Sequence, residues 1–342
     1  MEKGRLTFQC SDKALNEGFA WAKQQALAYT HEGDPVGDWY EAALPHRNSF
    51  CMRDVSHQCM GGEALGLHSH NQTMLLRFAQ SIAESRDFCS FWEMDSDYRP
   101  TGVDYTSDSD FWYNLPANFD LMDACWRVYR RSGDSSLVSS SDFTRFYDLT
   151  VHEYVKRWDS NGDGILERTA AVGRRGIPSY DENDGYRKAA VMSDLIAIQI
   201  RGYRSCAQLA RARQQKDEAA VCDRRADLLL QTLQGEWWDE KASQFYGMRT
   251  FDGQLEHGCG HTVALSYYQI LTDQAKQLAH LEQVHSAAAA KLPQVEELSH
   301  LGETFYKNRQ PERGLYWLRK MIAPDVPRRE YPELSYAAVD VF

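Results

Sequence analysis

The sequence predicts an all-α fold in which two concentric rings of helices form an (α/α)6 toroid. Three observations lead to this prediction. Helical periodicity dominates the chain, and the alternation typical of β-strands is not sustained anywhere. Amphipathic helical segments alternate with segments that are apolar nearly all round, as outer and buried helices do. The links that lead into the apolar segments are long, whereas the links that leave them are short.

Two segments illustrate the two classes of helix. In residues 142–158, apolar side chains recur at i, i+3, i+4 and i+7 and charged side chains take the other face. Residues 189–203, "AAVMSDLIAIQIRGY", are apolar nearly all round, which is typical of a buried helix. The expected outer helices are 11–31, 69–84, 140–158, 203–234, 273–290 and 310–321. The expected inner helices are 54–66, 115–130, 189–202, 261–271, 300–307 and 336 onward.

The six hairpins are expected to form a single domain over residues 1–342, because no linker or low-complexity segment divides the chain. The long links before the inner helices then gather at one end of the ring, and function concentrates in loops held by a rigid scaffold. The last inner helix would run from near Ser335 to Phe342. At about 1.5 Å per residue this is only about two turns, so we expect the last helix to be truncated.

Composition excludes several classes of partner. With 38 Lys and Arg against 49 Asp and Glu, the net charge is −11, which disfavours nucleic acid and anionic membranes as partners. No apolar run approaches the roughly 20 residues that span a bilayer. The 8 Cys are scattered singly and the N-terminus lacks an apolar signal segment. We therefore expect buried thiols and a cytoplasmic protein. The alternative is a secreted or periplasmic protein whose signal peptide has been removed.

Aromatic residues in non-helical segments suggest a carbohydrate ligand. The chain has 9 Trp and 18 Tyr, whose flat faces and polar edges suit the C–H faces of sugar rings. The candidates for contacts with a sugar are Trp39, Tyr40, Trp92, Trp112 and Tyr180. The alternative for each of them is packing within its own loop.

This layout and several strings of residues resemble a known group of enzymes. The strings are "FCMRDVSHQ", "SFWEMD", "DFWYNLPANFDLMDACW", "WDSNGDGILE", "YDENDGY" and "REYPELSY". Together they resemble the six-hairpin glycosidase superfamily, which includes glucoamylases, trehalases and α-rhamnosidases. The resemblance covers nearly the whole chain and implies inverting hydrolysis of a glycosidic bond. It also implies a general acid in the loop before the sixth helix and a general base in the loop before the twelfth.

The loop before the expected sixth helix reads "IPSYDENDGYRK" and holds Asp181, Glu182 and Asp184. Crowded carboxylates raise each other's pKa, which keeps an acid protonated near neutral pH. Glu182 is the first candidate for the general acid and Asp181 the second. A solvated acidic turn is the structural alternative.

The loop before the expected twelfth helix reads "PRREYPELSY" and offers Glu333 and then Glu330 as the base. We expect Arg328 and Arg329 to keep the carboxylate ionised, as a base requires. In an inverting enzyme the two carboxyl groups stand roughly 6.5–9.5 Å apart. The alternative is that Glu330 pairs with an arginine and Glu333 caps the coming helix.

Three further residues open the first inner helix. Asp54 and His57 are separated by i, i+3 and so share one face, next to Arg53. Carboxylate, guanidinium and imidazole groups can hold several hydroxyls of one sugar ring. The alternative is a local ion pair between Asp54 and an arginine at a helix terminus.

The loop before the fourth helix adds four candidates. Trp92 and Trp112 are expected to stack on sugars, Asp110 to bind a hydroxyl, and Glu93 to serve as a reserve catalytic carboxylate.

Two strings resemble metal sites without matching one. Asp159, Asn161 and Asp163 begin like a calcium-binding EF-hand loop, but Ala170 replaces the glutamate at position twelve. We expect a tight turn there, with structural Ca²⁺ as the alternative, and no cofactor. "HGCGH" contains His257, Cys259 and His261 at a spacing that fits no common zinc site. We expect His257 and His261 to line the rim of the sugar pocket.

The sequence thus predicts a glycoside hydrolase that inverts the anomeric centre and acts on oligosaccharides or chain ends. The alternatives are another toroid enzyme that acts on carbohydrate, either a polysaccharide lyase or a sugar epimerase, and a carbohydrate-binding protein without catalysis.

Overall fold

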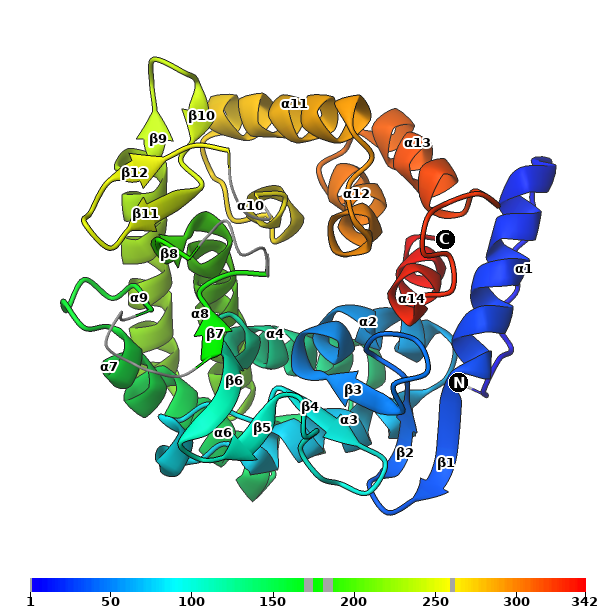
Figure 1. The fold of residues 1–342 in the computed structure, drawn as a ribbon, viewed down its shortest axis with the longest axis horizontal. Helices are drawn as coiled ribbons and strands as arrows, with labels where there is room; N and C mark the ends of the chain where they lie inside the picture. Colours follow the sequence, from blue (N-terminus) through cyan, green and yellow to red (C-terminus); the bar gives the residue numbers. More distant parts are fainter. Residues whose placement is uncertain (1, 169–174, 181–186, 259–261) are drawn as a thin grey trace.

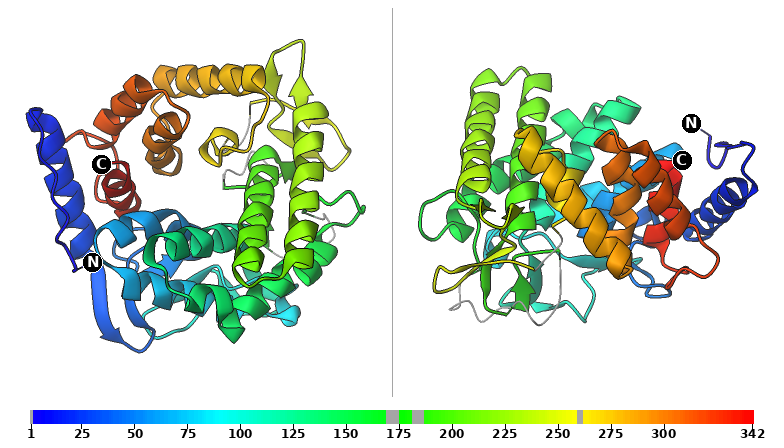
Figure 2. Two further views of the ribbon diagram at one scale, coloured as in Figure 1. Left: turned by 180° about the vertical axis from the view of Figure 1, so that it is seen from behind. Right: turned by 90° about the horizontal axis from the view of Figure 1, so that it is seen from above.

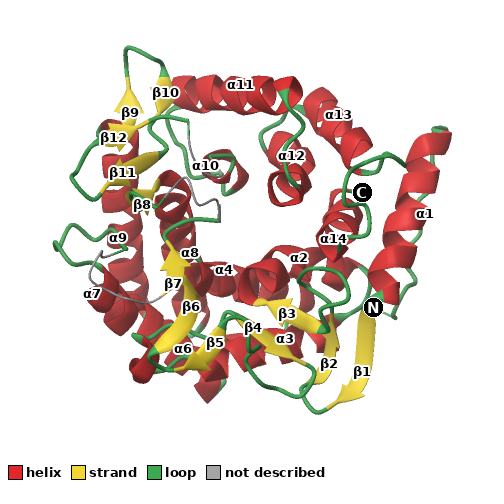
Figure 3. Ribbon diagram, in the orientation of Figure 1, coloured by secondary structure: helices red, strands yellow, loops and turns green. Residues whose placement is uncertain are grey.

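The computed structural model describes residues 2–168, 175–180, 187–258 and 262–342. These residues form a closed double ring of helices, seen along the ring axis in Figure 1 and by type of secondary structure in Figure 3. The predicted (α/α)6 toroid is therefore confirmed.

The inner ring consists of the second helix of each hairpin, as the alternation predicts. Each inner helix contacts the next one around the ring, and the last contacts the first. These helices are α2 (Met52–Ala64), α4 (Ala117–Ser132), α8 (Ser193–Ala212), α10 (Ala264–Tyr267), α12 (Val295–Lys307) and α14 (Pro332–Val341). The prediction that an outer helix begins at residue 203 is wrong. Tyr203, Cys206 and Ala210 are buried at helical spacing, so α8 continues along the inner ring to Ala212.

The outer ring covers the inner one. Its helices are α1 (Lys13–Ala28), α3 (His68–Ser81), α5 (Ser136–Ser139), α6 (Ser141–Leu149), α7 (Val155–Trp158), α9 (Lys216–Gly235), α11 (Gln274–Ala290) and α13 (Pro311–Met321). A π-helical turn (Thr150–Tyr154) joins α6 to α7, and a 3-10 turn (Glu84–Arg86) follows α3. Trp158, Trp237 and Trp317 are fully buried in the shared core. None of the described helices has both the length and the apolar character that a bilayer span requires.

Short strands occupy the long links before the inner helices. They are β1 (Thr30–Asp34), β2 (Gly37–Tyr40), β3 (Ser49–Cys51), β4 (Glu93–Asp95), β5 (Tyr105–Ser107), β6 (Asp110–Asn114), β7 (Arg175–Ile177), β8 (Ala189–Met192), β9 (Trp238–Asp239), β10 (Gln244–Phe245), β11 (Met248–Thr250) and β12 (Leu255–Glu256). The pairs β1–β2, β3–β4, β5–β6 and β9–β10 are antiparallel, β7 joins β6 in parallel, and β11 lies between β8 and β12. These strands are too short to show a clear alternation in the sequence.

The links differ in length largely as predicted. Residues 29–51, 82–116 and 236–263 form long connections into inner helices, and the right-hand view of Figure 2 shows the green and yellow strands on one side of the ring. The link before α12 is an exception, since only residues 291–294 separate it from α11.

The ring closes where α14 packs against α2 and α1. A Cβ atom at Gly61 would lie 2.2 Å from the carbonyl oxygen of Tyr336, so only glycine permits this approach. Tyr40 stacks on Tyr336 with ring centroids 4.4 Å apart, and Phe8 contacts Phe342 at 4.9 Å. α14 has 10 residues and still contacts α12, α2 and α1. The short last helix that we expected therefore does not open the ring.

Candidate active site

The candidate site lies where the inner helices begin. Arg53, Asp120, Asp194 and Glu333 occupy the first turns of α2, α4, α8 and α14. The amino ends of helices carry partial positive charge, which favours carboxylates at these positions. As predicted, the Arg53–His57 segment opens the first inner helix and faces this cluster.

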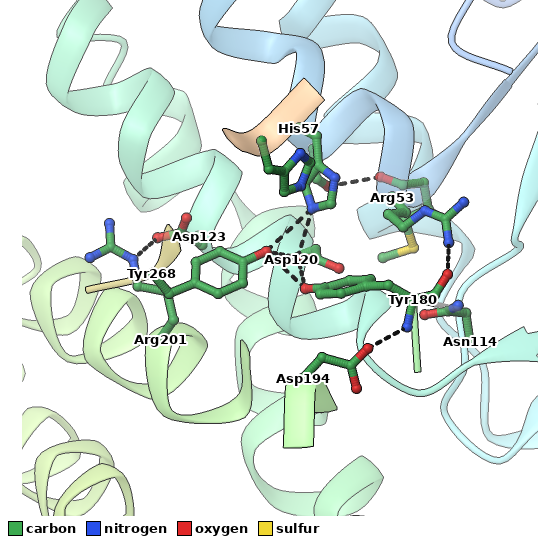
Figure 4. A network of polar contacts seen from close by, with 12 residues as sticks. Arg53, His57, Asn114, Asp120, Asp123, Tyr180, Asp194, Arg201 and Tyr268 are labelled. Atoms are coloured by element: carbon green, nitrogen blue, oxygen red, sulfur yellow. Dashed lines mark hydrogen bonds and ion pairs between the residues drawn. The ribbon is translucent and has the colours of Figure 1, made fainter. Parts of the chain in front are cut away.

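Asp120 is the centre of a hydrogen-bond network (Figure 4). The hydroxyls of Tyr180 and Tyr268 donate to its Oδ1 over 2.7 and 2.9 Å, and the two hydroxyl oxygens lie 2.8 Å apart. Nε2 of His57 lies 3.2 Å from the Tyr268 hydroxyl and 3.4 Å from Asp120 Oδ1. Side chains from α2, α4, the end of α10 and the link before α8 thus meet at one point.

Burial changes the charge states in this network. It raises the pKa of Asp120 to about 7, although the hydroxyls of Tyr180 and Tyr268 act in the opposite direction. Burial and then the charge of Arg53 lower the pKa of His57 well below its ordinary value, so the imidazole is neutral at physiological pH. Oδ2 of Asp120 is buried and has no hydrogen-bond partner among the described residues. This oxygen is therefore an unsatisfied acceptor among the described residues.

The predicted acid loop is attached to this network at its described end. Arg53 donates to the carbonyl of Tyr180 over 2.8 Å, and the backbone N–H of Tyr180 donates to Asp194 over 2.9 Å. Ser179 donates to the same carboxylate, and its own carbonyl accepts from Asn114. The backbone at Ser179 and Tyr180, directly before the acidic residues of the loop, is thus held in place. Asp181, Glu182 and Asp184 themselves lie outside the described residues.

Glu333 approaches the same network from α14, the helix beside α2 in the inner ring. It accepts a hydrogen bond of 2.9 Å from Ser299, whose hydroxyl also lies 2.9 Å from Nδ1 of His300. The rings of His57 and His300 are 4.5 Å apart. Ligand atoms of His57, His300 and Glu333 all lie within 4.8 Å of one another, so these three residues could hold a divalent cation.

The electrostatic surroundings of Glu333 differ from the prediction. Burial, and then the negative charges of Asp54 and Glu296, raise its pKa well above the ordinary value, while Arg53 lowers it. The arginines that we expected beside it have other contacts. Arg329 lies 3.7 Å from the ring centroid of Trp21 on α1, and Arg328 lies over Tyr331. The prediction that these two arginines keep the base ionised is therefore wrong.

Glu330 lies on the outer side of its loop. It is exposed, and its backbone carbonyl accepts a hydrogen bond from Tyr29, the residue that ends α1. Of the two candidates for the base, Glu333 is the one that lies beside the network around Asp120.

Two of the predicted sugar contacts belong to the core. Trp39 is fully buried, donates to Asp34 over 2.7 Å and stacks on His31. Tyr40 is also fully buried and donates to Asn71 over 2.7 Å. Neither ring has a face available to a ligand, so both predictions are corrected to loop packing.

The loop before α4 supports the site rather than entering it. Trp92 is almost buried and carries the Arg53 guanidinium 5.3 Å from its ring centroid, so it positions that arginine. Trp112 is half-buried within β6. Asp110 is exposed and pairs with Arg175 at 3.1 Å, a contact that differs from the predicted hydroxyl ligand.

The contacts of Glu93 indicate a structural role. It is buried, pairs with Arg47 at 2.9 Å and accepts from Ser49 and Thr101. These partners match a buried ion pair more closely than the predicted reserve catalytic group.

The metal-like strings have local partners. Asp159 accepts from the backbone N–H groups of Gly162 and Gly164, and Asp163 pairs with Arg249 at 3.1 Å. These are the contacts of the tight turn that we expected.

The prediction that His257 lines a sugar pocket is not supported by its contacts. It lies 3.0 Å from Asp239 and stacks on Tyr246, within the β9–β12 region outside the inner ring. Cys259 and His261 lie outside the described residues.

Sequence reasoning missed Asp120, Tyr268 and His300. A signal for Asp120 existed, since an acid in the first turn of a helix that is apolar nearly all round has no route to solvent and needs partners. The contributions of Tyr268 and His300 depend on ring geometry, because their shared partner His57 lies more than two hundred residues away along the chain.

The chain resembles solved glycosidases in fold, although its sequence matches no family model. No protein-family model matches the chain, and no curated protein matches it either. Among solved structures, it is similar to a GH78 family rhamnosidase of Bacillus sp. GL1, with a TM-score of 0.69 and 13% identity over 99% of this chain. It is also similar to a rhamnosidase from Klebsiella oxytoca with rhamnose bound, with a TM-score of 0.66 and 11% identity over 92% of this chain.

A third similar structure is a protein described as a glycosidase, with a TM-score of 0.65 and 11% identity over 97% of this chain. The fold is that of these glycosidases. The chain spans 35% and 55% of the lengths of the two rhamnosidases, and 98% of the length of the glycosidase. A variant of that glycosidase has been solved in complex with glucose.

Proposed function

We propose that the protein is a glycoside hydrolase that cleaves a glycosidic bond with inversion of the anomeric centre. One observation carries the proposal. The residue directly before the acidic loop, Tyr180, and the candidate base, Glu333, both border His57 at the amino ends of the inner helices. The shared fold with solved rhamnosidases and a glycosidase supports it.

In this proposal Glu182, with Asp181 as the alternative, protonates the leaving oxygen, and Glu333 removes a proton from the attacking water. Because burial raises its pKa, Glu333 must first lose its own proton, and the nearby charge of Arg53 favours that ionised form. Arg53, His57 and Oδ2 of Asp120 bind hydroxyls and orient the sugar ring. Carboxyl groups make both proton transfers, so we expect EDTA to leave turnover unchanged.

The described floor of the site favours action on a chain end. Tyr267 and Tyr268 are both buried, and the Tyr268 hydroxyl lies 3.2 Å from Nε2 of His57. Buried rings at the inner end of the site are compatible with the exo action that the sequence analysis expects.

The test replaces one carboxyl group at a time. Aryl rhamnosides and aryl glucosides are suitable first substrates, because rhamnose and glucose occur in the similar structures. We expect Glu182→Gln and Glu333→Gln each to lower turnover by on the order of 10²–10⁴ while sugar binding remains. Glu330→Gln is the matched control, since it changes an exposed carboxylate of the same loop.

Product stereochemistry tests the mechanism separately. An NMR spectrum recorded during the first turnovers should show the anomer opposite to that of the substrate. Initial formation of the substrate's own anomer would contradict inversion.

A sugar epimerase is the second candidate, because neutral His57 faces His300 with Tyr180 nearby. Such a group could abstract a proton from carbon. In D₂O an epimerase would place deuterium on the sugar without releasing an aglycone, whereas a hydrolase would release the aglycone and leave carbon-bound hydrogens unlabelled.

A further inference from the structure

A second cavity lies at the other end of the ring, towards the carboxyl ends of the inner helices. Its volume is about 490 Å³, within the range of about 300–1,000 Å³ that small-molecule sites occupy. Cationic side chains reach it from three inner helices. They are Arg127, Arg130 and Arg131 from α4, Arg201 from α8, and Lys307 from α12.

Two of these arginines are held in place by one carboxylate. Asp123 accepts from Nε of Arg127 over 2.8 Å and from Nε of Arg201 over 2.6 Å. Burial alone would raise the pKa of Asp123, but the guanidinium groups of Arg201 and Arg127 hold it below the ordinary value. Among the described contacts, Arg201 uses only its Nε atom. Its terminal N–H groups therefore remain donors on a side chain of fixed position.

The remaining carboxyl groups do not balance the positive charge. Lys307 is paired with Glu303 at 2.5 Å. Burial and the charge of Glu303 raise the pKa of Asp340 to about 7, so this carboxyl is only partly ionised near neutral pH. Arg130 and Arg131 are exposed in the last turn of α4. Cations at a helix end also stabilise its terminal carbonyls, but that role does not require a cavity of this size.

We propose that this cavity binds a small oxyanion, namely a phosphate or sulfate group. Guanidinium groups match the geometry of such oxyanions and donate two parallel hydrogen bonds to them. Tyr267, Glu303 and Asp340 also line the small cavity beside His57, His300 and Glu333, but none of the arginines and not Lys307 does so. The proposal therefore stands independently of the hydrolase function.

The experiment titrates inorganic phosphate into the full chain by calorimetry, with sodium chloride added to keep the ionic strength constant. We expect saturable binding and a phosphate-dependent rise in Tm. The double variant Arg130→Gln/Arg131→Gln should bind at least about tenfold more weakly, equivalent to about 1.4 kcal/mol. Arg224→Gln is the matched control, because it removes an exposed arginine from outer helix α9.

Three results would overturn the proposal. They are the absence of saturable binding to the wild-type chain, equal binding by the wild type and the double variant, and equal weakening in the Arg224→Gln control. Circular dichroism checks that the variants are folded. Lys307→Gln provides a second test from another helix of the cavity, since it should also weaken phosphate binding.

Discussion

Compared with the wild type, the variant Asp120→Asn should be more stable at high pH and less stable at low pH. The carboxyl group titrates near 3.8 when unfolded and near 7 when folded. Between these values the unfolded chain binds fewer protons than the folded one, so stability falls as the pH rises. At 1.36 kcal/mol per pKa unit, ionised Asp120 costs about 4 kcal/mol above pH 7. Asparagine has the same shape and cannot ionise.

The substitution also has a cost that does not depend on pH. An amide N–H₂ replaces Oδ2, which has no described partner, and burying an unsatisfied polar group costs about 1–3 kcal/mol. The net gain near pH 8 should therefore be about 1–3 kcal/mol, turning into a net loss near pH 4. If Oδ2 binds substrate, the same variant should lose sugar affinity.

Urea unfolding of both proteins near pH 4 and near pH 8 measures the effect. The mutational change in free energy should differ by about 4 kcal/mol between the two pH values. Asp110→Asn is the control, since this exposed, ion-paired aspartate should contribute less than about 1 kcal/mol at either pH. An Asp120→Asn effect that is the same at both pH values would show that Asp120 is not held protonated by burial.

Three further substitutions test the structural assignments. Glu93→Gln should destabilise the fold by about 1–3 kcal/mol, because Arg47 loses its closer ion pair and keeps only Asp104 at 3.5 Å. Urea unfolding measures this, and a loss of turnover without a loss of stability would restore the catalytic interpretation. Trp39→Ala should lower the free energy of unfolding by about 3–5 kcal/mol, because it creates a cavity in the core. Calorimetry should find the sugar affinity unchanged, and weaker sugar binding by the folded variant would count against core packing. Gly61→Ala should lower the Tm, because the added Cβ would clash with the backbone carbonyl of Tyr336. Gly102→Ala is the control and should leave the Tm nearly unchanged, because a Cβ there meets nothing within 4 Å. Equal shifts in the two variants would contradict the close approach.

The helical architecture was predictable because its signal is local. Amphipathic and buried helices differ in their distribution of apolar residues along a few turns, and that difference identified six inner and six outer segments. The boundary at residue 203 was wrong because an apolar stripe continues beyond it, through Cys206 and Ala210. The short strands were invisible because pairing between distant links, rather than alternation, defines them.

The site was predictable mainly where residues fall at a helix start. Arg53 and His57 could be placed there, whereas the fate of a loop aromatic depends on which neighbours fold over it. Trp39 faces the core and Tyr180 faces the network, yet both follow a turn-rich segment in the sequence. Asp120 was overlooked because its flanking residues indicate burial, and burial is what gives this acid its unusual pKa.

The contact between α14 and α2 has a consequence for how the chain folds. These helices are separated by more than 260 residues, so the ring closes only when two distant parts of the chain meet. Until then the surfaces of α2 and α12 that α14 covers are exposed to solvent. Loop-closure entropy makes the pairing of such distant segments slow. We therefore infer that the contact between α14 and α2 forms last. Pulsed hydrogen exchange during refolding would test this order, and protection of α14 ahead of α4 and α8 would contradict it.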